Sequence, residues 1–426
     1  MSDAPIVVIG GGAIGLCSAF YLRQAGAAVV VVESGELGAG ASRGNAGWVC
    51  LSHSAPVPSP GAAWYALRSF GQPDAPLYVK LRPSVAFLSW LLAFYRSCNR
   101  STFERGYAAV AQFSRSTFEL FAQLESAGVK TGLRRLGMVQ AFLSADEAEH
   151  HRALQAGMSW AGYSVPHAVE RGSAVRALEP ALSDAVAAAY LIEGEGVLDP
   201  MQFISALAAH LSEHGVCILE NAPATRLLRD GRRIRAVIAG DSELECSSVL
   251  IAAGVWSAEL ARQVGVRLPL QSGKGYSFSI DLDPAPTRAL YFGEKRVAVS
   301  PIGGTTRLAG TMELSGNNRE LDWQRIVAIA RGSRPYLGNW YAHDEDLPRL
   351  LNDPWVGGRP MLPDGIPVLD RLPTVDNAYL ATGHAMLGMT LAPASGQAMA
   401  RLMLEGRRPV ELEPFTLERP RGFERL

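Results

Sequence analysis

The chain has 426 residues, more than a single hydrophobic core usually accommodates, so we expect two domains. Its 40 Lys and Arg residues almost balance its 41 Asp and Glu residues, and the formal net charge of -1 excludes the basic excess typical of proteins that bind nucleic acid or anionic lipid. The five cysteines show no spacing typical of a zinc site or a redox pair, so we expect free thiols and no metal.

The first predicted unit is a strand, a helix and a second strand. Residues 6–9 are an apolar run, residues 13–25 have the pattern of a helix, and residues 28–32 form another apolar run that ends at Glu33. Nucleotide-binding domains often begin with this arrangement. The residues before it carry no positively charged segment, and glycines interrupt the apolar stretch, so we expect no secretory signal and a cytoplasmic protein.

A glycine-rich turn joins the first strand to the helix. Gly10 permits the tight turn, Gly12 lets a pyrophosphate approach the backbone, and Gly15 allows the helix to pack closely on the strand. Glu33 can accept hydrogen bonds from a ribose diol. The turn therefore predicts a dinucleotide cofactor, NAD or FAD, with contacts at Gly10, Gly12, Ala13, Ile14, Gly15 and Glu33.

Residues 59–125 are mainly helical in pattern and interrupt the nucleotide-binding unit. Within them, residues 84–95 place Phe87, Trp90, Leu91 and Phe94 at helical spacing on one face. Two interpretations stay open: the face packs against the core, or the helix lies at the surface and contacts a membrane or a quinone. No apolar run reaches the roughly 18 to 20 residues that span a bilayer, so any membrane contact is expected to be peripheral.

Strands dominate the rest of the chain. A plausible hairpin turn is Asp230-Gly231, and residues 248–253 have the pattern of a buried strand. The other predicted strands are residues 137–143, 187–191, 276–280, 297–300, 306–310, the surroundings of Trp355, and residues 378–382. The other predicted helices begin near Asp199 and span residues 323–331 and 393–404.

Two further turns favour FAD over NAD. Residues 252–256 end an apolar strand with small residues that let a nucleotide approach the backbone. Residues 382–390 form a turn that leads into a helix, and a helix N-terminus can stabilise the negative charge of a reduced flavin. No second glycine fingerprint is present, so we expect electrons to leave to an acceptor other than NAD. The expected contacts are Ala253, Gly254, Trp256, Gly383, His384, Leu387, Gly388, Met389 and Thr390, with His384 as a support for the flavin or, alternatively, a base.

A candidate substrate-binding residue lies just before this last turn. Arg359 is flanked by glycines and a proline, and the planar guanidinium of an arginine suits bidentate binding of a carboxylate. Tyr276 could donate its hydroxyl to the same carboxylate, although tyrosines in strands are more often packing residues. The pair predicts a small substrate that carries a carboxylate.

Several segments in order resemble one family. They are residues 42–47, 88–98, 273–277, 355–367, 383–390 and 421–423. Over nearly its whole length the chain resembles the D-amino acid dehydrogenases of the bacterial small-subunit type, within the D-amino acid oxidase superfamily of flavoproteins.

This resemblance implies an α/β fold with two interleaved domains. A Rossmann-like domain that binds FAD without a covalent bond would comprise residues 1–60, 195–268 and 355–426. An α+β substrate domain built on a mostly antiparallel sheet would comprise residues 61–194 and 269–354. The resemblance also places residues near the cofactor and the substrate: Ser42, Asn45, Ala46 and Gly47 beside the flavin, Ala224 at the adenine, and Arg359 with Tyr276 at the substrate carboxylate.

The implied reaction is the oxidative deamination of a D-amino acid to a 2-oxo acid and ammonia, with hydride transfer to flavin N5 and electrons passed to a membrane quinone. Ala385 and Met389 replace a glycine and a tryptophan of the family's usual turn, and Trp48 stands where a smaller or polar residue is common. The preferred substrate therefore stays open, and D-proline or hydroxyproline are alternatives. Other interpretations are an oxidase of sarcosine or glycine that reduces oxygen, and a flavin-bearing subunit of a larger complex.

Overall fold

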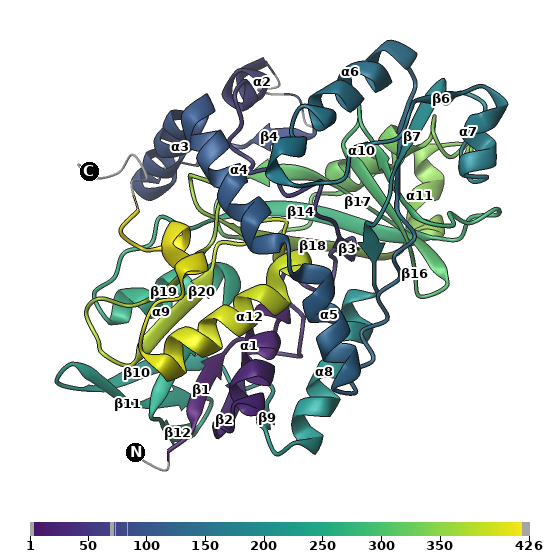
Figure 1. Cartoon of the computed structure of the whole chain (residues 1–426). Coiled ribbons are helices and arrows are strands. Elements are labelled where there is room, and N and C mark those ends of the chain that lie inside the picture. Colours follow the sequence, from purple (N-terminus) through teal and green to yellow (C-terminus); the bar gives the residue numbers. More distant parts are fainter. Residues whose placement is uncertain (1–3, 69–71, 73, 83, 420–426) are drawn as a thin grey trace.

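The computed structural model describes residues 4–68, 72, 74–82 and 84–419 (Figure 1). The segment 421–423, which contributes to the family resemblance, lies outside the described residues. The described chain is built around a six-stranded sheet and a nine-stranded sheet. A small three-stranded sheet extends from the first of these.

The six-stranded sheet contains the predicted nucleotide-binding unit. Its centre is β1 (Ile6–Ile9), which pairs in parallel with β2 (Val29–Val32) and with β13 (Ser248–Ile251). These strands are nearly continuous apolar runs because helices or other strands cover both faces of a buried parallel sheet. The remaining strands are β9 (Cys217–Leu219) beside β2, β20 (Ala378–Thr382) beside β13, and β19 (Val368–Arg371) at the far edge.

Two helices from opposite ends of the chain cover one face of this sheet. They are α1 (Ala13–Gln24) and α12 (Gly388–Glu405), which run side by side in Figure 1. A Cβ added at Gly396 would lie 2.6 Å from the carbonyl carbon of Cys17, so the glycine lets the two backbones approach. The sequence prediction that this last helix begins near Pro393 is wrong: α12 begins five residues earlier, and its apolar contacts with α1 outweigh the backbone hydrogen bond that the proline cannot make.

Other helices join the same core. Residues of α4 (Arg100–Ser114), α5 (Thr117–Ser126) and α8 (Pro200–Glu213) are buried in one apolar cluster with α1 and α12. The three-stranded sheet consists of β10 (Ala224–Asp230), β11 (Arg233–Ala239) and β12 (Ser242–Glu245). The hairpin predicted at Asp230-Gly231 is confirmed, since Asp230 pairs with Arg233 across the turn.

The nine-stranded sheet is mostly antiparallel, which confirms the predicted fold class. Its order begins β18 (Asn352–Met361), β14 (Gln271–Ile280), β17 (Thr305–Leu314) and β16 (Val297–Ile302). It continues with β15 (Ala289–Phe292), β5 (Met138–Phe142), β7 (Ala188–Ile192) and β6 (Glu170–Arg171), while β4 (Leu77–Val79) pairs with β17. Helix α10 (Trp323–Ser333) packs on one face of this sheet.

The remaining regular elements are short or peripheral. Strands β3 (Trp48–Val49) and β8 (Gly196–Val197) form a small pair between the two large sheets. The helices not yet given are α2 (Ala62–Arg68), α3 (Val85–Ser97), α6 (Ala145–Ala156), α7 (Ser173–Leu178), α9 (Ser257–Gln263) and α11 (Leu347–Leu350). No helix in the described ranges is long and apolar enough to cross a membrane.

The predicted domain limits remain a proposal, and the observed packing differs from them at two places. Strand β18 is hydrogen-bonded to β14, so residues 355–361 belong with the nine-stranded sheet and not with the nucleotide-binding half. Helices α4 and α5 pack against the nucleotide-binding half, although the sequence-based limits assign them to the substrate domain.

Helix α3 is apolar on two faces. Phe87, Trp90 and Phe94 are buried against Met312 and Met361, so that face of the helix packs on the core. The opposite face exposes Val85, Leu88, Leu92 and Tyr95, with 82% of Val85 and 61% of Tyr95 accessible to solvent. If this helix contacts a membrane or a quinone, it does so through these exposed residues and not through the four residues that the sequence pattern singled out.

Candidate active site

A cavity of about 1550 Å³ lies between the two large sheets. The parallel strands β1, β13 and β20 all point their carboxyl ends toward it, which is where open α/β sheets bind ligands. Most of the predicted site residues line it: Gly10, Gly12, Ala13, Ile14, Glu33, Ser42, Asn45, Ala46, Ala224, Ala253, Gly254, Trp256, Arg359, His384, Leu387, Gly388, Met389 and Thr390. The predicted residues Gly15, Gly47, Gly383 and Tyr276 are not among the lining residues.

The glycine turn after β1 has the geometry of a phosphate cradle. Gly10 has φ +117°, and a Cβ there would lie 2.5 Å from the carbonyl oxygen of Ala252. A Cβ at Gly15 would lie 1.9 Å from the carbonyl oxygen of Gly10, so Gly15 acts by allowing the helix to pack on the turn. At Gly12 a Cβ would meet only Ser42 Oγ, at 3.4 Å. The backbone at Gly12 is thus open to the cavity.

Glu33 holds the neighbouring loop at the end of β2. Its Oε2 accepts a hydrogen bond from the backbone N–H of Gly11 at 2.8 Å, and its Oε1 accepts one from Ser34 Oγ at 2.8 Å. The carboxylate therefore lies beside the glycine turn and lines the cavity, together with Ala224 at the start of β10. This is the end of the cavity at which the sequence predicts the ribose and the adenine.

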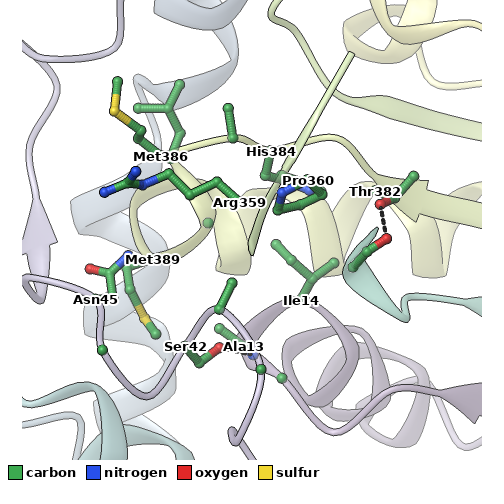
Figure 2. A pocket seen from close by; sticks show the side chains of 18 of the residues that line it. Ala13, Ile14, Ser42, Asn45, Arg359, Pro360, Thr382, His384, Met386 and Met389 are labelled. Atoms are coloured by element: carbon green, nitrogen blue, oxygen red, sulfur yellow. Dashed lines mark hydrogen bonds between the residues drawn. The ribbon is translucent and has the colours of Figure 1, made fainter. Parts of the chain in front are cut away.

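The N-termini of α1 and α12 both open into the cavity. Neither helix has an acidic residue in its first turn, and neither N-cap side chain accepts a hydrogen bond from it, so the partial positive charge of each N-terminus is not neutralised by a carboxylate of its own first turn and can act on a ligand. The turn before α12 is tied to the turn after β13, because Thr382 Oγ1 donates to the carbonyl oxygen of Gly254 at 2.8 Å (Figure 2).

The loop of residues 42–50 passes over the same cavity. Ser42 Oγ accepts a hydrogen bond from the N–H of Ala13 at 3.3 Å, and Asn45 Oδ1 accepts one from the N–H of Gly47 at 2.7 Å. Gly47 has φ +71°, and a Cβ there would lie 2.0 Å from the carbonyl oxygen of Leu198, so it shapes the turn without lining the cavity. Thr390 Oγ1 donates to the carbonyl oxygen of Trp48 at 3.3 Å, which joins this loop to α12.

These features fit FAD. The open backbone at Gly12 and the N-terminus of α1 suit a pyrophosphate, and the N-terminus of α12 suits a second centre of negative charge in the same ligand. One mononucleotide would occupy only part of a cavity that extends from Ala224 to Arg359.

Arg359 projects from β18 into the cavity, between Met386 and the Asn45–Met389 side (Figure 2). Its Nη1 donates to the carbonyl oxygen of Thr311 at 2.9 Å, and no Asp or Glu of the described residues forms an ion pair with it. Removal of the guanidinium from bulk water lowers the pKa of Arg359 to about 10, so the side chain still carries its charge at neutral pH. A Cβ added at Gly275 would lie 2.2 Å from its Cζ, so this glycine leaves the space that the guanidinium fills.

Tyr276 does not reach the cavity, and the prediction that it contacts the substrate is not supported by its position. Successive residues of a strand point to opposite faces of the sheet. On β14, Gly275 faces Arg359, whereas Tyr276 lies on the other face, where its hydroxyl donates to Glu313 Oε2 at 2.6 Å. Glu313 also binds Lys274 in a buried ion pair. Tyr276 is therefore part of a structural network under the sheet.

His384 has the surroundings of a support for the flavin turn. Its side chain is 3% exposed, and Nε2 lies 2.9 Å from Ser395 Oγ on α12. Burial lowers the pKa of His384 to about 3, so the imidazole is neutral at physiological pH. The next residue, Ala385, has φ +48°, which explains why the related turns often have glycine there.

Several lining residues are not among the predicted contacts, although Trp48 already stands out in the sequence as a position that bears on the choice of substrate. Trp48 Nε1 donates to Ser300 Oγ at 2.8 Å, and its ring packs edge-on against His53 and Tyr291. His151, Tyr65 and Arg296 complete this end of the cavity. They come from separate segments, and Arg296 lies in a charged hairpin turn of the kind that is usually solvated, so the sequence offers no signal that gathers them.

The comparisons with known proteins match almost the whole length of the chain. The family model described as "FAD dependent oxidoreductase" matches residues 5–402. A D-amino acid dehydrogenase of Paramagnetospirillum magneticum is 31% identical, over 97% of this chain and 98% of that protein. A D-amino acid dehydrogenase of Methylobacterium radiotolerans is 30% identical, over 95% and 96% of the two chains.

Solved structures share the fold at lower identity. Glycine oxidase from Bacillus cereus has a TM-score of 0.72 and 22% identity, over 98% of this chain and 99% of that one. L-proline dehydrogenase from P. horikoshii has a TM-score of 0.69 and 17% identity, over 97% of both chains. At sequence identities this low, the similarity to these structures shows a shared fold and nothing more.

Proposed function

Because this chain belongs to the family of FAD-dependent oxidoreductases, we propose that it is a D-amino acid dehydrogenase that converts D-amino acids to 2-oxo acids and ammonia. Relatives that carry this name match it at about the same length from end to end. The sequence contains no second dinucleotide fingerprint, which argues against NAD as the electron acceptor, and the resemblance to D-amino acid dehydrogenases favours a quinone.

The unpaired guanidinium of Arg359 is the observation that carries this proposal. A half-enclosed cation without an acidic neighbour among the described residues favours an anionic ligand, and its planar fork suits the two oxygens of a carboxylate. The acidic side chains that line the cavity, Glu33 and Glu259, lie near the nucleotide-binding turns and do not compete for this position.

The side chains of the site orient the substrate. When bound, FAD accepts a hydride from the carbon that carries the amine. Arg359 holds the carboxylate and thereby limits the rotation of the substrate, which is the main contribution that a positioning residue can make. His384 is neutral and hydrogen-bonded to Ser395, so we assign it to the support of the turn before α12 and not to proton transfer.

We further propose that FAD is bound without a covalent bond. Cys50 lines the cavity, but its thiol donates to the carbonyl oxygen of Gly196, and burial holds the pKa of Cys50 well above its usual range. His384 is engaged with Ser395. Neither side chain is thus a reactive nucleophile, and acid precipitation of the purified protein should release all of the flavin into the supernatant.

The decisive experiment is anaerobic reduction of the bound flavin by a panel of D-amino acids, L-amino acids, glycine, sarcosine and D-proline. We expect bleaching by D-amino acids, with electrons passed on to a soluble quinone and little production of peroxide in air. Bleaching by L-enantiomers alone would overturn the stereochemical part of the proposal. Bleaching by glycine, sarcosine or D-proline alone would favour an oxidase or dehydrogenase of those compounds.

Arg359→Ala tests the carboxylate site. We expect a fall in kcat/KM for D-amino acids of about a hundredfold or more, because the substrate carboxylate is left desolvated and unpaired. Arg371→Gln, on the exposed end of β19, is the matched control and should leave kcat/KM within about twofold. An unchanged kcat/KM in Arg359→Ala excludes the assigned role.

A further inference from the structure

Besides Arg359, two arginines line the cavity and form no ion pair with the described acids: Arg319, which lies over the ring of Trp256, and Arg296. Arg296 lies in the turn between β15 and β16, and its Cζ is 4.8 Å from the ring centroid of Tyr65. It forms no ion pair with any described Asp or Glu. The nearest acid in the sequence, Glu294, is engaged elsewhere: it accepts hydrogen bonds from the N–H groups of Leu143 and Ser144 and from the hydroxyl of Tyr336.

Arg296 and Arg359 approach the same point of the cavity wall from two sides. Val297 pairs with Gly310 across β16 and β17, which brings Arg296 level with Thr311 on the neighbouring strand. Arg359 Nη1 donates to the carbonyl oxygen of that same Thr311. The backbone of Arg296 and the guanidinium of Arg359 thus lie beside the same residue of β17.

The backbone at this point is strained. Arg296 has φ +51° and Thr311 has φ +56°, both in the left-handed region that residues other than glycine rarely adopt. Such conformations persist where the surrounding structure imposes them, and they are frequent at ligand-binding sites. The turn therefore presents Arg296 to the cavity at a cost in backbone energy.

None of the described residues that line the cavity around Arg296 is acidic. Burial lowers the pKa of His53 to about 3 and that of His151 to about 4, so both imidazoles are neutral at physiological pH. Tyr291 and Trp48 supply aromatic edges between them. Two permanent cations thus lie at this end of the cavity, and none of its described lining residues there is acidic.

We propose that Arg296 binds an anionic group at the end of the substrate's side chain, so that the preferred substrates are D-amino acids with a side-chain carboxylate. This inference rests on the proposed function in one respect: it takes the carboxylate next to the amine as the ligand of Arg359. The aromatic side chains that line the cavity, Trp48 and Tyr291, would pack against the methylene groups of the substrate's side chain.

The kinetic test compares D-glutamate with D-glutamine, which have nearly the same shape and differ in charge. In Arg296→Gln we expect the ratio of kcat/KM for D-glutamate over D-glutamine to fall about tenfold, the effect of losing one charge-assisted hydrogen bond. Arg296→Lys should restore part of the ratio. Lys295→Gln should keep it, because Lys295 is exposed on the same turn, as Arg296 is, but does not line the cavity. Because each ratio is internal to one variant, a loss of folded protein does not affect it.

A binding test separates this inference from the proposed function. Titration of the oxidised holoenzyme with glutarate and with butyrate, followed by the flavin absorbance, should show glutarate binding at least about tenfold more tightly, and Arg296→Gln should abolish the difference. If D-amino acids reduce the flavin but neither ratio depends on Arg296, the inference is overturned and the proposed function stands. If no amino acid reduces the flavin but glutarate still binds through Arg296, the proposed function fails and the second anion site stands.

Discussion

At the scale of single residues, the reach of Arg359 depends on the absence of a side chain across the strand. A Cβ at Gly275 would lie 2.2 Å from Cζ and 2.2 Å from Nη2 of Arg359, far inside van der Waals contact. Gly275→Ala should therefore displace the guanidinium and lower kcat/KM for amino acids by about a hundredfold, the effect of misplacing a substrate-binding group by about 1 Å.

Ser277→Ala, on the same strand, is the control for a general disturbance of β14. Thermal unfolding of the holoenzyme checks that both variants are folded. Full activity in Gly275→Ala would contradict the tight packing around Arg359.

The structure brings one of the two predicted substrate-binding side chains to the cavity and not the other. Arg359 stands out because glycines and a proline confine the chain around it, and the structure brings it into the cavity. Tyr276 lies close to it in the sheet, but the alternation of a strand turns it to the opposite face. Arg296 carries no sequence signal, since only the pairing of β16 with β17 brings it beside Thr311.

At the scale of elements, the crossing of α1 and α12 fixes both helix N-termini that face the cofactor cavity. Gly396→Ala would place a methyl group 2.6 Å from the carbonyl carbon and 2.7 Å from the carbonyl oxygen of Cys17. Neither is the end of a flexible side chain, so the helices must separate. We expect the free energy of unfolding to fall by about 1–3 kcal/mol and the affinity for FAD to fall with it.

Urea unfolding and fluorescence titration of the apoprotein with FAD measure these two quantities. Gln397→Ala, the next residue on α12, should change the free energy of unfolding by less than about 0.5 kcal/mol. If Gly396→Ala is as stable as the wild type, the two helices can accommodate a methyl group where they cross.

Helix α3 makes a second prediction at this scale. Its exposed residues Leu88 and Leu92 lie on an apolar face, as expected of a helix that rests on a membrane surface. We expect the protein to float with phospholipid vesicles and the double variant Leu88→Glu, Leu92→Glu to remain with the unbound fraction.

Leu154→Glu is the matched control, because Leu154 is an exposed leucine on another helix, α6. Equal flotation of the wild type and the double variant would exclude α3 as the contact. In the presence of vesicles, the wild type and Leu154→Glu should also reduce a quinone faster than the double variant does.

At the scale of the whole molecule, buried neutral histidines make the fold sensitive to acid. The pKa of His384 is about 3 in the folded protein, and an unfolded histidine titrates near 6.5. Between these values the unfolded chain binds a proton that the folded chain does not, so the stability that His384 contributes is complete above about pH 6.5 and is lost as the pH falls.

The free energy of unfolding, measured in urea from pH 7.5 to pH 4.5, should therefore fall more steeply for the wild type than for His384→Gln. The difference in the free energy of unfolding between the wild type and His384→Gln should shrink by about 1.4 kcal/mol per pH unit below pH 6. A gap that does not change with pH would show that His384 does not remain neutral in the folded state.

The sequence predicts the overall architecture better than it predicts the limits of the two domains. The glycine turn, the apolar runs and the two later turns suffice to predict the parallel sheet and its cofactor edge. The limits of the halves depend on which sheet β18 joins and on which core α4 and α5 pack against, and both are decided by contacts between distant segments. Local patterns carry no information on such contacts.

The order of strands in the six-stranded sheet bears on how the protein is made. Strand β1, near the start of the chain, pairs with β13, which in turn pairs with β20, near its end. A ribosome therefore has to release residues 378–405 before the second helix N-terminus and its turn can join the first. We therefore expect the flavin to be loaded only after translation, and a shortage of cellular flavin to leave the chain more sensitive to proteases until then.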